Sequence, residues 1–318
     1  MSTLAKTFGI AARNFTAYPE MPSAKALVEY GVWVEELGYD SVWVWDHVLL
    51  GVDPNFPIID SLTTLTGIAA RTKRIKMGTG ILVLPLRNAV GLAKQLSSMD
   101  QLSDGRLIMG MASGWYKREF DAMGVPFEKR GKIMDENLEI LRRLWTEESV
   151  SGTYMRHNIS KAVMYPKPAQ PKIPLLIGGY ADPVLKRAGV SGDGWLTYFY
   201  RPSDFKKSWD KIVNFAKEGG KDPSTLLNAS QLPIRIGKSR QEVEAGMLDW
   251  LNKEWDFPAN SDCSRESAVM GSVDECVAQL REHIAMGVQK IIFVPYKYEP
   301  DQIEMIAREI IPRLRSEK

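Results

Sequence analysis

The chain has 318 residues, 44% of them apolar and 25% charged, and its 41 basic and 39 acidic residues leave a formal net charge of +2. This length allows two domains or one large α/β barrel, and the near-average composition excludes a disordered, collagen-like or coiled-coil chain. The balanced charge argues against a nucleic-acid partner. Because no segment resembles a signal peptide or a bilayer-spanning helix, we expect a cytoplasmic protein without membrane contacts.

Eight short apolar segments, rich in β-branched or aromatic residues, alternate with amphipathic helical patterns. Their apolar runs are nearly continuous, which is typical of parallel strands that are buried on both faces. Eight strand–helix units in one chain predict a single (β/α)8 TIM barrel over residues 1–318. The predicted strands are 8–12, 41–45, 75–79, 107–111, 175–177, 194–197, 230–236 and 290–294.

Local signals refine this outline. Ser239 with Glu242 and Ser272 with Glu275 have the spacing of capping boxes, so we expect helices to begin there. The intervals at about 150–174 and 252–270 are too long for simple connections, and the first has room for a short hairpin. We expect both to be insertions at the C-terminal face of the barrel.

In a barrel, chemistry gathers where the strands end, and here those ends are aromatic with few ions. The three histidines, His47, His157 and His283, lie on separate elements, and Cys263 and Cys276 lack a C-x-x-C partner, so no metal site is expected. Paired carboxylates for glycoside hydrolysis and a desolvated strand-end lysine for Schiff-base chemistry are also missing from the strand ends.

His47 is the best single candidate for handling a proton. It follows the second predicted strand directly, next to Asp46, whose carboxylate could orient the imidazole ring, so both are candidate catalytic residues. A lone histidine is often only structural, and that alternative stays open.

A second candidate lies after the fifth predicted strand, at Gly178, Gly179 and Tyr180. Asp182 and Pro183 then mark a helix start, so free backbone amides could hold a phosphate. A tight strand-to-helix turn explains the same glycines equally well.

Three blocks in the same order resemble the bacterial luciferase-like monooxygenases, a superfamily of barrels that use flavin or deazaflavin. The longest is GTGILVLPLRNAVGLAKQLSSMDQLSDGRLIMGMASGWYKREFDAMGV at residues 78–125, and the others are ELGYDSVW at 36–43, followed by Asp46-His47, and PLLIGG at 174–179. The resemblance covers nearly the whole chain.

This resemblance implies an isoalloxazine-type ring in the aromatic mouth, with its phosphate near Gly178 and Gly179. It also implies a non-proline cis peptide between Gly80 and Ile81. His47 would face the reactive edge of the ring. The other implied cofactor contacts are Thr79, Ser113, Gly114 and Tyr180.

The chain departs from two branches of that superfamily. Ala112-Ser113 replaces the Cys-Arg pair of light-emitting subunits, which argues against bioluminescence, and Trp115 replaces the glutamate of deazaflavin-linked sugar dehydrogenases. Trp115 is then either a wall of the substrate pocket, which we favour, or core packing. Further candidates for the pocket are Tyr18, Tyr198, Tyr296 and Arg201.

The first functional hypothesis is therefore a two-component monooxygenase that takes reduced FMN from a flavin reductase and uses O2 to oxygenate a small apolar or aromatic substrate. The alternative is a coenzyme F420-dependent oxidoreductase that moves hydride to or from a small molecule. A basic rim around Arg201 would suit its acidic tail, although a solvated helix face explains those charges equally well. A flavin-binding subunit without turnover is a third possibility, and the resemblance implies a homo-oligomer.

Overall fold

The computed structural model describes residues 6–52, 55–254 and 266–316, and within them all eight predicted strands are present. Seven strand pairings within the main sheet of the described residues are parallel. The strands follow the order β9-β11-β1-β2-β3-β4-β7-β8, and β8 pairs back to β9, so that within the described residues they close an eight-stranded barrel. Their bounds are β1 Thr7–Ala11, β2 Ser41–Val44, β3 Lys76–Val83, β4 Leu107–Ala112, β7 Leu175–Gly178, β8 Gly194–Tyr198, β9 Leu227–Ile236 and β11 Lys290–Pro295.

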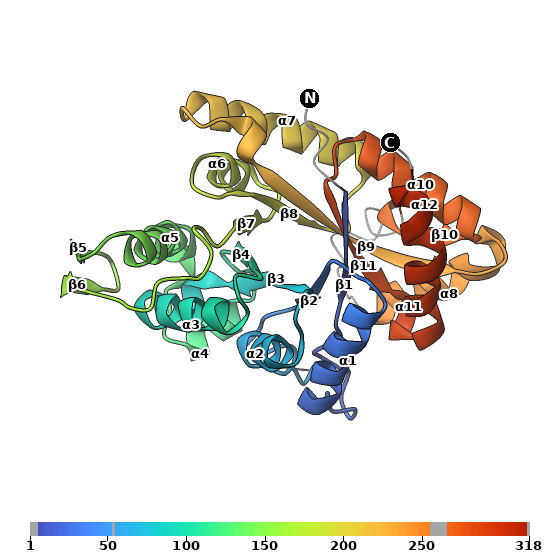
Figure 1. Ribbon diagram of the computed structural model, residues 1–318, viewed down its shortest axis with the longest axis horizontal. Coiled ribbons are helices and arrows are strands. Elements are labelled where there is room, and N and C mark those ends of the chain that lie inside the picture. Colours follow the sequence, from blue (N-terminus) through green and yellow to red (C-terminus); the bar gives the residue numbers. More distant parts are fainter. Residues whose placement is uncertain (1–5, 53–54, 255–265, 317–318) are drawn as a thin grey trace. The chain divides into compact units, whose positions relative to one another are not determined.

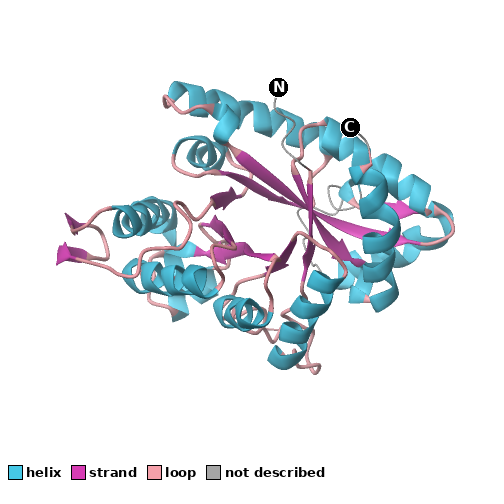
Figure 2. Cartoon of the chain, in the orientation of Figure 1, coloured by secondary structure: helices cyan, strands magenta, loops and turns pink. Residues whose placement is uncertain are grey.

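The chain divides into two compact units, which are described separately. The first unit comprises Met1–Arg13, Glu29–Trp43 and Leu176–Lys318, and the second comprises Asn14–Val28 and Val44–Leu175. Helix α1, Ala24–Glu36, crosses the boundary in sequence. In both units a helix follows nearly every barrel strand, and Figure 2 shows this alternation of strand and helix.

In the first unit, helices α6 and α7 pack side by side after strands β7 and β8 (Figure 1). Strand β10, Val269–Gly271, pairs in parallel with β9. It was not predicted, because it is only three residues long. Gly194 allows β8 to approach β9, since a Cβ on it would lie 1.8 Å from the Leu227 carbonyl oxygen. The helices are α6 Asp182–Val190, α7 Pro202–Glu218, α8 Arg240–Glu254, α10 Val273–Ala285, α11 Pro300–Met305 and α12 Ile311–Arg315, with a π-helical turn at Ile306–Ile310.

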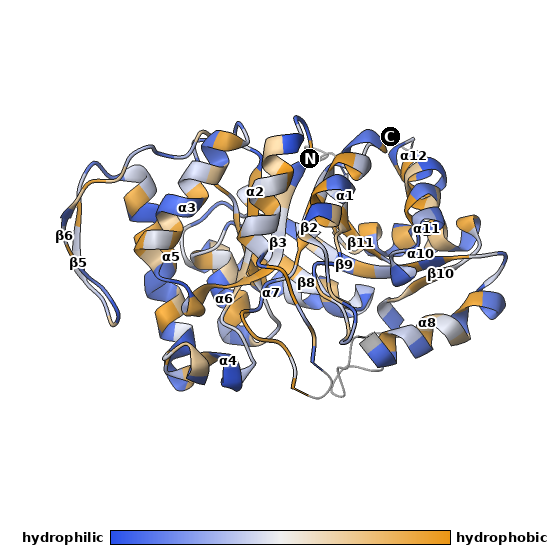
Figure 3. Cartoon of the chain, turned by 90° about the horizontal axis from the view of Figure 1, so that it is seen from below, coloured by the Kyte–Doolittle hydropathy of each residue, from blue (hydrophilic) through white to orange (hydrophobic). Residues whose placement is uncertain are grey.

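In the second unit, α3 and α5 lie side by side, and the hairpin of β5 and β6 follows α5 (Figure 1). The short hairpin that the sequence left room for within 150–174 is thus present, while the place of this insertion at the C-terminal face of the barrel stays a prediction. Helix α5 carries apolar residues on one face and charged ones on the other, which gives it both colours in Figure 3. The elements are α2 Ser61–Arg71, α3 Ala89–Leu102, α4 Lys117–Ala122, α5 Arg130–Thr146, β5 Val150–Thr153 and β6 Asn158–Ala162.

The helix starts predicted from capping boxes are found, but the two boxes differ. Ser272 and Glu275 make both reciprocal hydrogen bonds at the start of α10. At α8 the Glu242 N–H reaches Ser239 Oγ at 3.4 Å, while the Glu242 carboxylate accepts from the Lys238 N–H instead of Ser239. The first cap is therefore complete and the second only half made.

The second predicted insertion, at 252–270, lies largely outside the described residues, and so does Cys263. Cys276 is a buried thiol, and burial raises its pKa to about 12. Across the part of the chain that the structure describes, no helix has the length and apolar character needed to cross a membrane.

Strand β3 carries an irregularity at the position that the family resemblance implied. The Gly80–Ile81 peptide is cis, and the pairing of β3 with β4 shifts register between Thr79 and Leu82. Ile81 is half-buried, whereas the residues on both sides of it in the strand are buried. The Ile81 side chain packs against a buried cluster of apolar residues and stays only partly exposed; the cluster consists of Val83, Leu86, Phe120, Val125 and Ile133.

Candidate active site

The His47 ring is positioned by a contact with a carboxylate that is distant in sequence. Its Nδ1 lies 3.1 Å from Oε2 of Glu119, which belongs to α4 and is 1% exposed. The histidine side chain is 15% exposed, and Nε2 has no hydrogen-bond partner among the described residues. The ring is therefore fixed through one nitrogen, while the other remains available to a ligand.

Glu119 also organises the backbone that follows His47. Its Oε1 accepts hydrogen bonds from the N–H groups of Val48 and Leu49, the second at 3.1 Å. One buried carboxyl group thus binds three consecutive residues. Because buried acceptors are costly unless they are satisfied, these contacts explain why a glutamate can be buried here.

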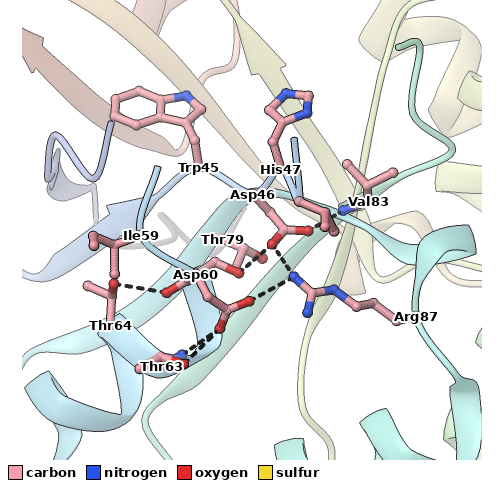
Figure 4. Close-up of polar contacts among 12 residues, drawn as sticks. Trp45, Asp46, His47, Ile59, Asp60, Thr63, Thr64, Thr79, Val83 and Arg87 are labelled. Atoms are coloured by element: carbon pink, nitrogen blue, oxygen red, sulfur yellow. Dashed lines mark hydrogen bonds and ion pairs between the residues drawn. The ribbon is translucent and has the colours of Figure 1, made fainter. Parts of the chain in front are cut away.

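Asp46 has a different role from the one expected. Figure 4 shows its side chain pointing away from the side on which Trp45 and His47 lie, as alternation along an extended chain requires. Its carboxylate accepts from Ser61 Oγ at 2.7 Å and the Val83 N–H at 3.0 Å, and it pairs with Arg87. The prediction that Asp46 orients the His47 ring is therefore wrong, because Glu119 occupies that position.

The Asp46 contacts belong to an ion network that ties the ends of β2 and β3 to α2. Arg87 bridges Asp46 and Asp60, and Asp60 also caps α2 through the Thr63 N–H at 2.9 Å (Figure 4). Burial alone would raise the pKa of Asp60, but the Thr63 and Arg87 contacts outweigh it and lower that pKa. Burial likewise opposes the charge on Arg87, yet the two aspartates raise its pKa.

The expected cofactor contacts of the second unit lie on β3 and after β4. Thr79 is fully buried, and its hydroxyl donates to the Gly110 carbonyl at 2.7 Å. The Thr79 hydroxyl therefore links β3 to β4. Gly114 has φ +79°, and a Cβ on it would meet Val83 and Phe120 at 2.7–2.9 Å. Gly114 is thus required by packing, whereas Ser113 is half-buried and Ile81 lies on the bulge.

Two predicted pocket residues of the second unit are exposed. Trp115 is 60% exposed and meets His47 edge to face, with ring centroids 6.1 Å apart. Core packing is therefore excluded for Trp115, and the indole is available to a ligand beside the histidine. Tyr18 is 61% exposed, and its backbone N–H donates to the Asn55 carbonyl. Among the described residues it makes no hydrogen bond or ring contact with His47.

In the first unit, Gly178 ends β7 and Gly179 turns the chain at φ +126° toward α6. The Gly179 carbonyl accepts from Trp195 Nε1 at 2.8 Å. The Tyr180 hydroxyl accepts the Tyr198 N–H at 2.8 Å and donates to its carbonyl. Tyr180 therefore connects the turn to β8 through hydrogen bonds, so its side chain has a structural role. Phosphate binding at Gly178 and Gly179 stays a prediction.

The other candidates of the first unit are more enclosed than expected. Tyr296 is 6% exposed, packs edge to face on Trp250 and lies under the Arg235 guanidinium at 3.9 Å, so the structure gives it a packing role. Tyr198 stacks on Phe199 with centroids 3.9 Å apart. Burial raises the pKa of Tyr198 well above its usual value.

Arg201 and its neighbours form a mixed-charge surface and not an uninterrupted basic rim. Arg201 pairs with Asp204 and with Glu266 at 3.0 Å, and Lys207 lies 3.7 Å from Asp204. Lys206 pairs with Asp210 along α7. These contacts favour the solvated helix face that the sequence left open.

The family model described as luciferase-like monooxygenase matches residues 7–290. The chain belongs to this family. It is 26% identical over 330 residues to an F420-dependent glucose-6-phosphate dehydrogenase of Amycolatopsis mediterranei strain U-32, covering 95% of this chain and 98% of the relative. It is 27% identical over 343 residues to a 5,10-methylenetetrahydromethanopterin reductase of Methanolobus tindarius, covering 96% and 99%.

A solved structure agrees with the family assignment at the level of fold. An F420-dependent secondary alcohol dehydrogenase, in complex with an F420–acetone adduct, superposes with a TM-score of 0.85 at 22% identity, covering 98% of this chain and 99% of the other. The predicted TIM barrel is thereby confirmed, and the chain is an oxidoreductase of the luciferase-like family.

Sequence reasoning missed Glu119 and Arg87 as site residues. Glu119 lies in the charged run Lys117-Arg118-Glu119, which by residue type predicts a solvated helix face. Only Phe120, next to it, signals that one side of this short helix is buried. The contact with His47 spans 72 residues of sequence and depends on how β2 and α4 are placed, which no local pattern encodes.

Proposed function

We propose that the protein is a coenzyme F420-dependent oxidoreductase that interconverts a small alcohol and the corresponding carbonyl compound. The observation that carries the proposal is the His47 ring, which is held through Nδ1 by Glu119 and has Nε2 open. Converting an alcohol to a carbonyl needs a proton acceptor beside the hydride acceptor, and a histidine fixed in this way suits that role. The Amycolatopsis relative, which is F420-dependent by name and aligns with 95% of the chain, supports the choice of cofactor.

Several residues of the second unit suit a flat, partly apolar ring system. Ile81 is half-buried at the cis bulge within an otherwise buried strand, Ser113 is half-buried, and Trp115 is exposed beside the histidine. Apolar surface with a few polar groups is typical of a cofactor site. In this proposal the backbone at Gly80 and Ile81 and the segment Ser113–Gly114 hold the ring.

When bound, the deazaflavin would supply a carbon that exchanges hydride with the substrate. The chain's own contribution is to transfer the proton. In the oxidation direction, His47 Nε2 accepts the hydroxyl proton as the C–H hydride leaves the same carbinol carbon, and in reduction it returns that proton to the carbonyl oxygen. Trp115 covers one side of the histidine and helps to keep water from the reacting oxygen.

The same surroundings restrict the substrate. Leu49 and Val52 are exposed apolar residues in the segment that follows His47, and Trp115 lies beside the ring. None of these offers a charge to a phosphate group. We therefore propose an apolar or aromatic alcohol in place of the sugar phosphate named for the Amycolatopsis relative.

The test is to titrate the purified protein with oxidised F420 and, separately, with reduced FMN under air, each with a panel of primary and secondary alcohols. We expect tight binding of F420 and an alcohol-dependent loss of its visible absorbance, without uptake of O2. Binding of reduced FMN with substrate-dependent uptake of O2, and no reduction of F420, would overturn the proposal.

A second candidate is the FMN-dependent monooxygenase expected first from the sequence, which would need a separate flavin reductase as partner. The apolar residues in the segment that follows His47 favour it, since oxygen transfer requires that water be excluded. The same titration distinguishes the two candidates, because only the monooxygenase consumes O2 in proportion to its substrate.

A further inference from the structure

We infer that Glu119 is a positioning residue that sets the tautomer of His47 and so makes Nε2 the proton acceptor. The inference rests on the proposed function for its kinetic consequence, but its structural basis is independent of any cofactor. It follows from which atoms surround the two oxygens of one buried carboxyl group.

The first step concerns Oε1 of Glu119. This oxygen accepts from the backbone N–H groups of Val48 and Leu49. A backbone N–H can only donate, so an acceptor must stand at this position. The two N–H groups therefore fix the rotation of the carboxylate and leave Oε2 directed at His47.

The second step concerns Oε2, which lies 3.1 Å from Nδ1 of His47. An ionised carboxylate has no hydrogen to donate and can only accept, so Nδ1 carries the hydrogen of this contact. In a neutral imidazole the other nitrogen then has the lone pair. The geometry thus places a basic Nε2 on the open side of the ring, as in serine-protease triads where a buried aspartate holds the histidine in the required tautomer.

The third step identifies the substitution that reverses this arrangement. In Glu119→Gln the two backbone N–H groups still require a carbonyl oxygen, so the amide oxygen stays with Val48 and Leu49 and the NH2 group faces His47. That NH2 group donates to Nδ1, which must then be the acceptor, and the hydrogen moves to Nε2. The variant keeps the volume and most hydrogen bonds of the site but presents a donor where the reaction needs an acceptor.

The experiment is nitrogen NMR of protein labelled with 15N-histidine, without cofactor, at a pH well above the ordinary histidine pKa. We expect His47 with hydrogen on Nδ1 in the wild type and on Nε2 in Glu119→Gln. Asp46→Asn is the matched control: it alters the neighbouring buried carboxylate, which contacts Ser61, Val83 and Arg87 but not the ring, and should leave the His47 tautomer unchanged. His47→Gln assigns the signals.

Kinetics supply the second readout. With F420 and an alcohol that the wild type oxidises, Glu119→Gln should lower kcat by about 10²–10⁴-fold while the affinity for F420 changes by less than about threefold. An Nδ1–H tautomer that persists in Glu119→Gln, or an Nε2–H tautomer in the wild type, would overturn the inference. A wild type that shows the expected tautomers but never reduces F420 would instead count against the proposed function.

Discussion

At the scale of single residues, two buried carboxylates contact the segment that follows β2 and have separate roles. Glu119 holds the imidazole of His47, and Asp46 points the other way into an ion network with Arg87 and Asp60. One carboxylate therefore serves the proposed chemistry, and the other fixes the backbone that carries it. The side-chain partners, more than the position in sequence, distinguish the two roles.

The proton role of His47 is tested by His47→Asn, whose amide can replace Nδ1 as a donor to Glu119 but cannot exchange a proton. We expect kcat for alcohol oxidation to fall by about 10²–10⁴-fold, because general-base assistance is lost. Binding of F420, measured by fluorescence titration, should change little. A kcat within threefold of the wild type would contradict the role of His47.

The structural role of Asp46 is tested by Arg87→Met, which removes its cationic partner and leaves the carboxylate, 2% exposed, without a balancing charge. We expect a loss of about 3–5 kcal/mol in the free energy of unfolding, measured in urea. Asp60→Asn is the control, because Asp60 is 42% exposed and its side-chain oxygen can still cap α2; it should cost less than about 1 kcal/mol. Equal losses of stability in the two variants would contradict the claim that the buried Arg87–Asp46 pair contributes more to stability than the exposed Arg87–Asp60 pair.

His283 makes a pH-dependent contribution to stability. It lies on α10, and burial lowers its pKa from 6.5 to about 4, so the folded protein resists protonation there. Between these values the unfolded chain binds more protons, and stability falls as the pH falls from 6.5 toward 4. The full loss is roughly 3 kcal/mol at about 1.4 kcal/mol per pKa unit.

This contribution is measured by urea unfolding of the wild type and of His283→Gln at a series of pH values from 7 to 4. The variant should have a shallower decline of stability with acid, whatever its stability at pH 7. Parallel curves for the two proteins would show that His283 does not titrate differently on folding.

At the scale of elements, the barrel strands and helix caps could be predicted from the sequence, whereas the short elements β10 and α4 could not. The eight barrel strands are nearly continuous apolar runs bounded by turns, so local pattern and tertiary environment agree. Strand β10 has only three residues and forms through pairing with β9. Helix α4 has six, so neither its existence nor the buried face that holds Glu119 could be deduced from periodicity.

The difference between the two caps predicts unequal costs for the same substitution. Ser272→Ala removes the hydroxyl of a complete capping box on α10 and should cost about 1 kcal/mol of stability. Ser239→Ala removes a 3.4 Å contact at α8, where Glu242 is bonded to Lys238, and should cost about half as much or less. Urea midpoints of the two variants, compared with the wild type, give the answer; a larger loss at Ser239 would contradict the distinction.

At the scale of the whole molecule, the barrel and the family follow from sequence, while the roles of several candidates do not. His47, Trp115 and the Gly80–Ile81 peptide were found because strand ends and family blocks mark them. Tyr296 and Tyr180 were assigned to a ligand site as aromatic residues near strand ends, yet packing on Trp250 and bonding to Tyr198 occupy them. Whether an aromatic side chain serves the core or a ligand depends on neighbours contributed by other elements.

The central claim is that hydride passes directly between the substrate and a deazaflavin while His47 takes the proton. The most direct test is to incubate the protein with oxidised F420 and an accepted alcohol that carries deuterium on the carbinol carbon, and to examine the reduced cofactor by NMR. Direct transfer predicts deuterium in the reduced deazaflavin and none in the solvent. Reduced cofactor that contains only solvent hydrogen, or an alcohol that is consumed only with reduced FMN and O2, would contradict it.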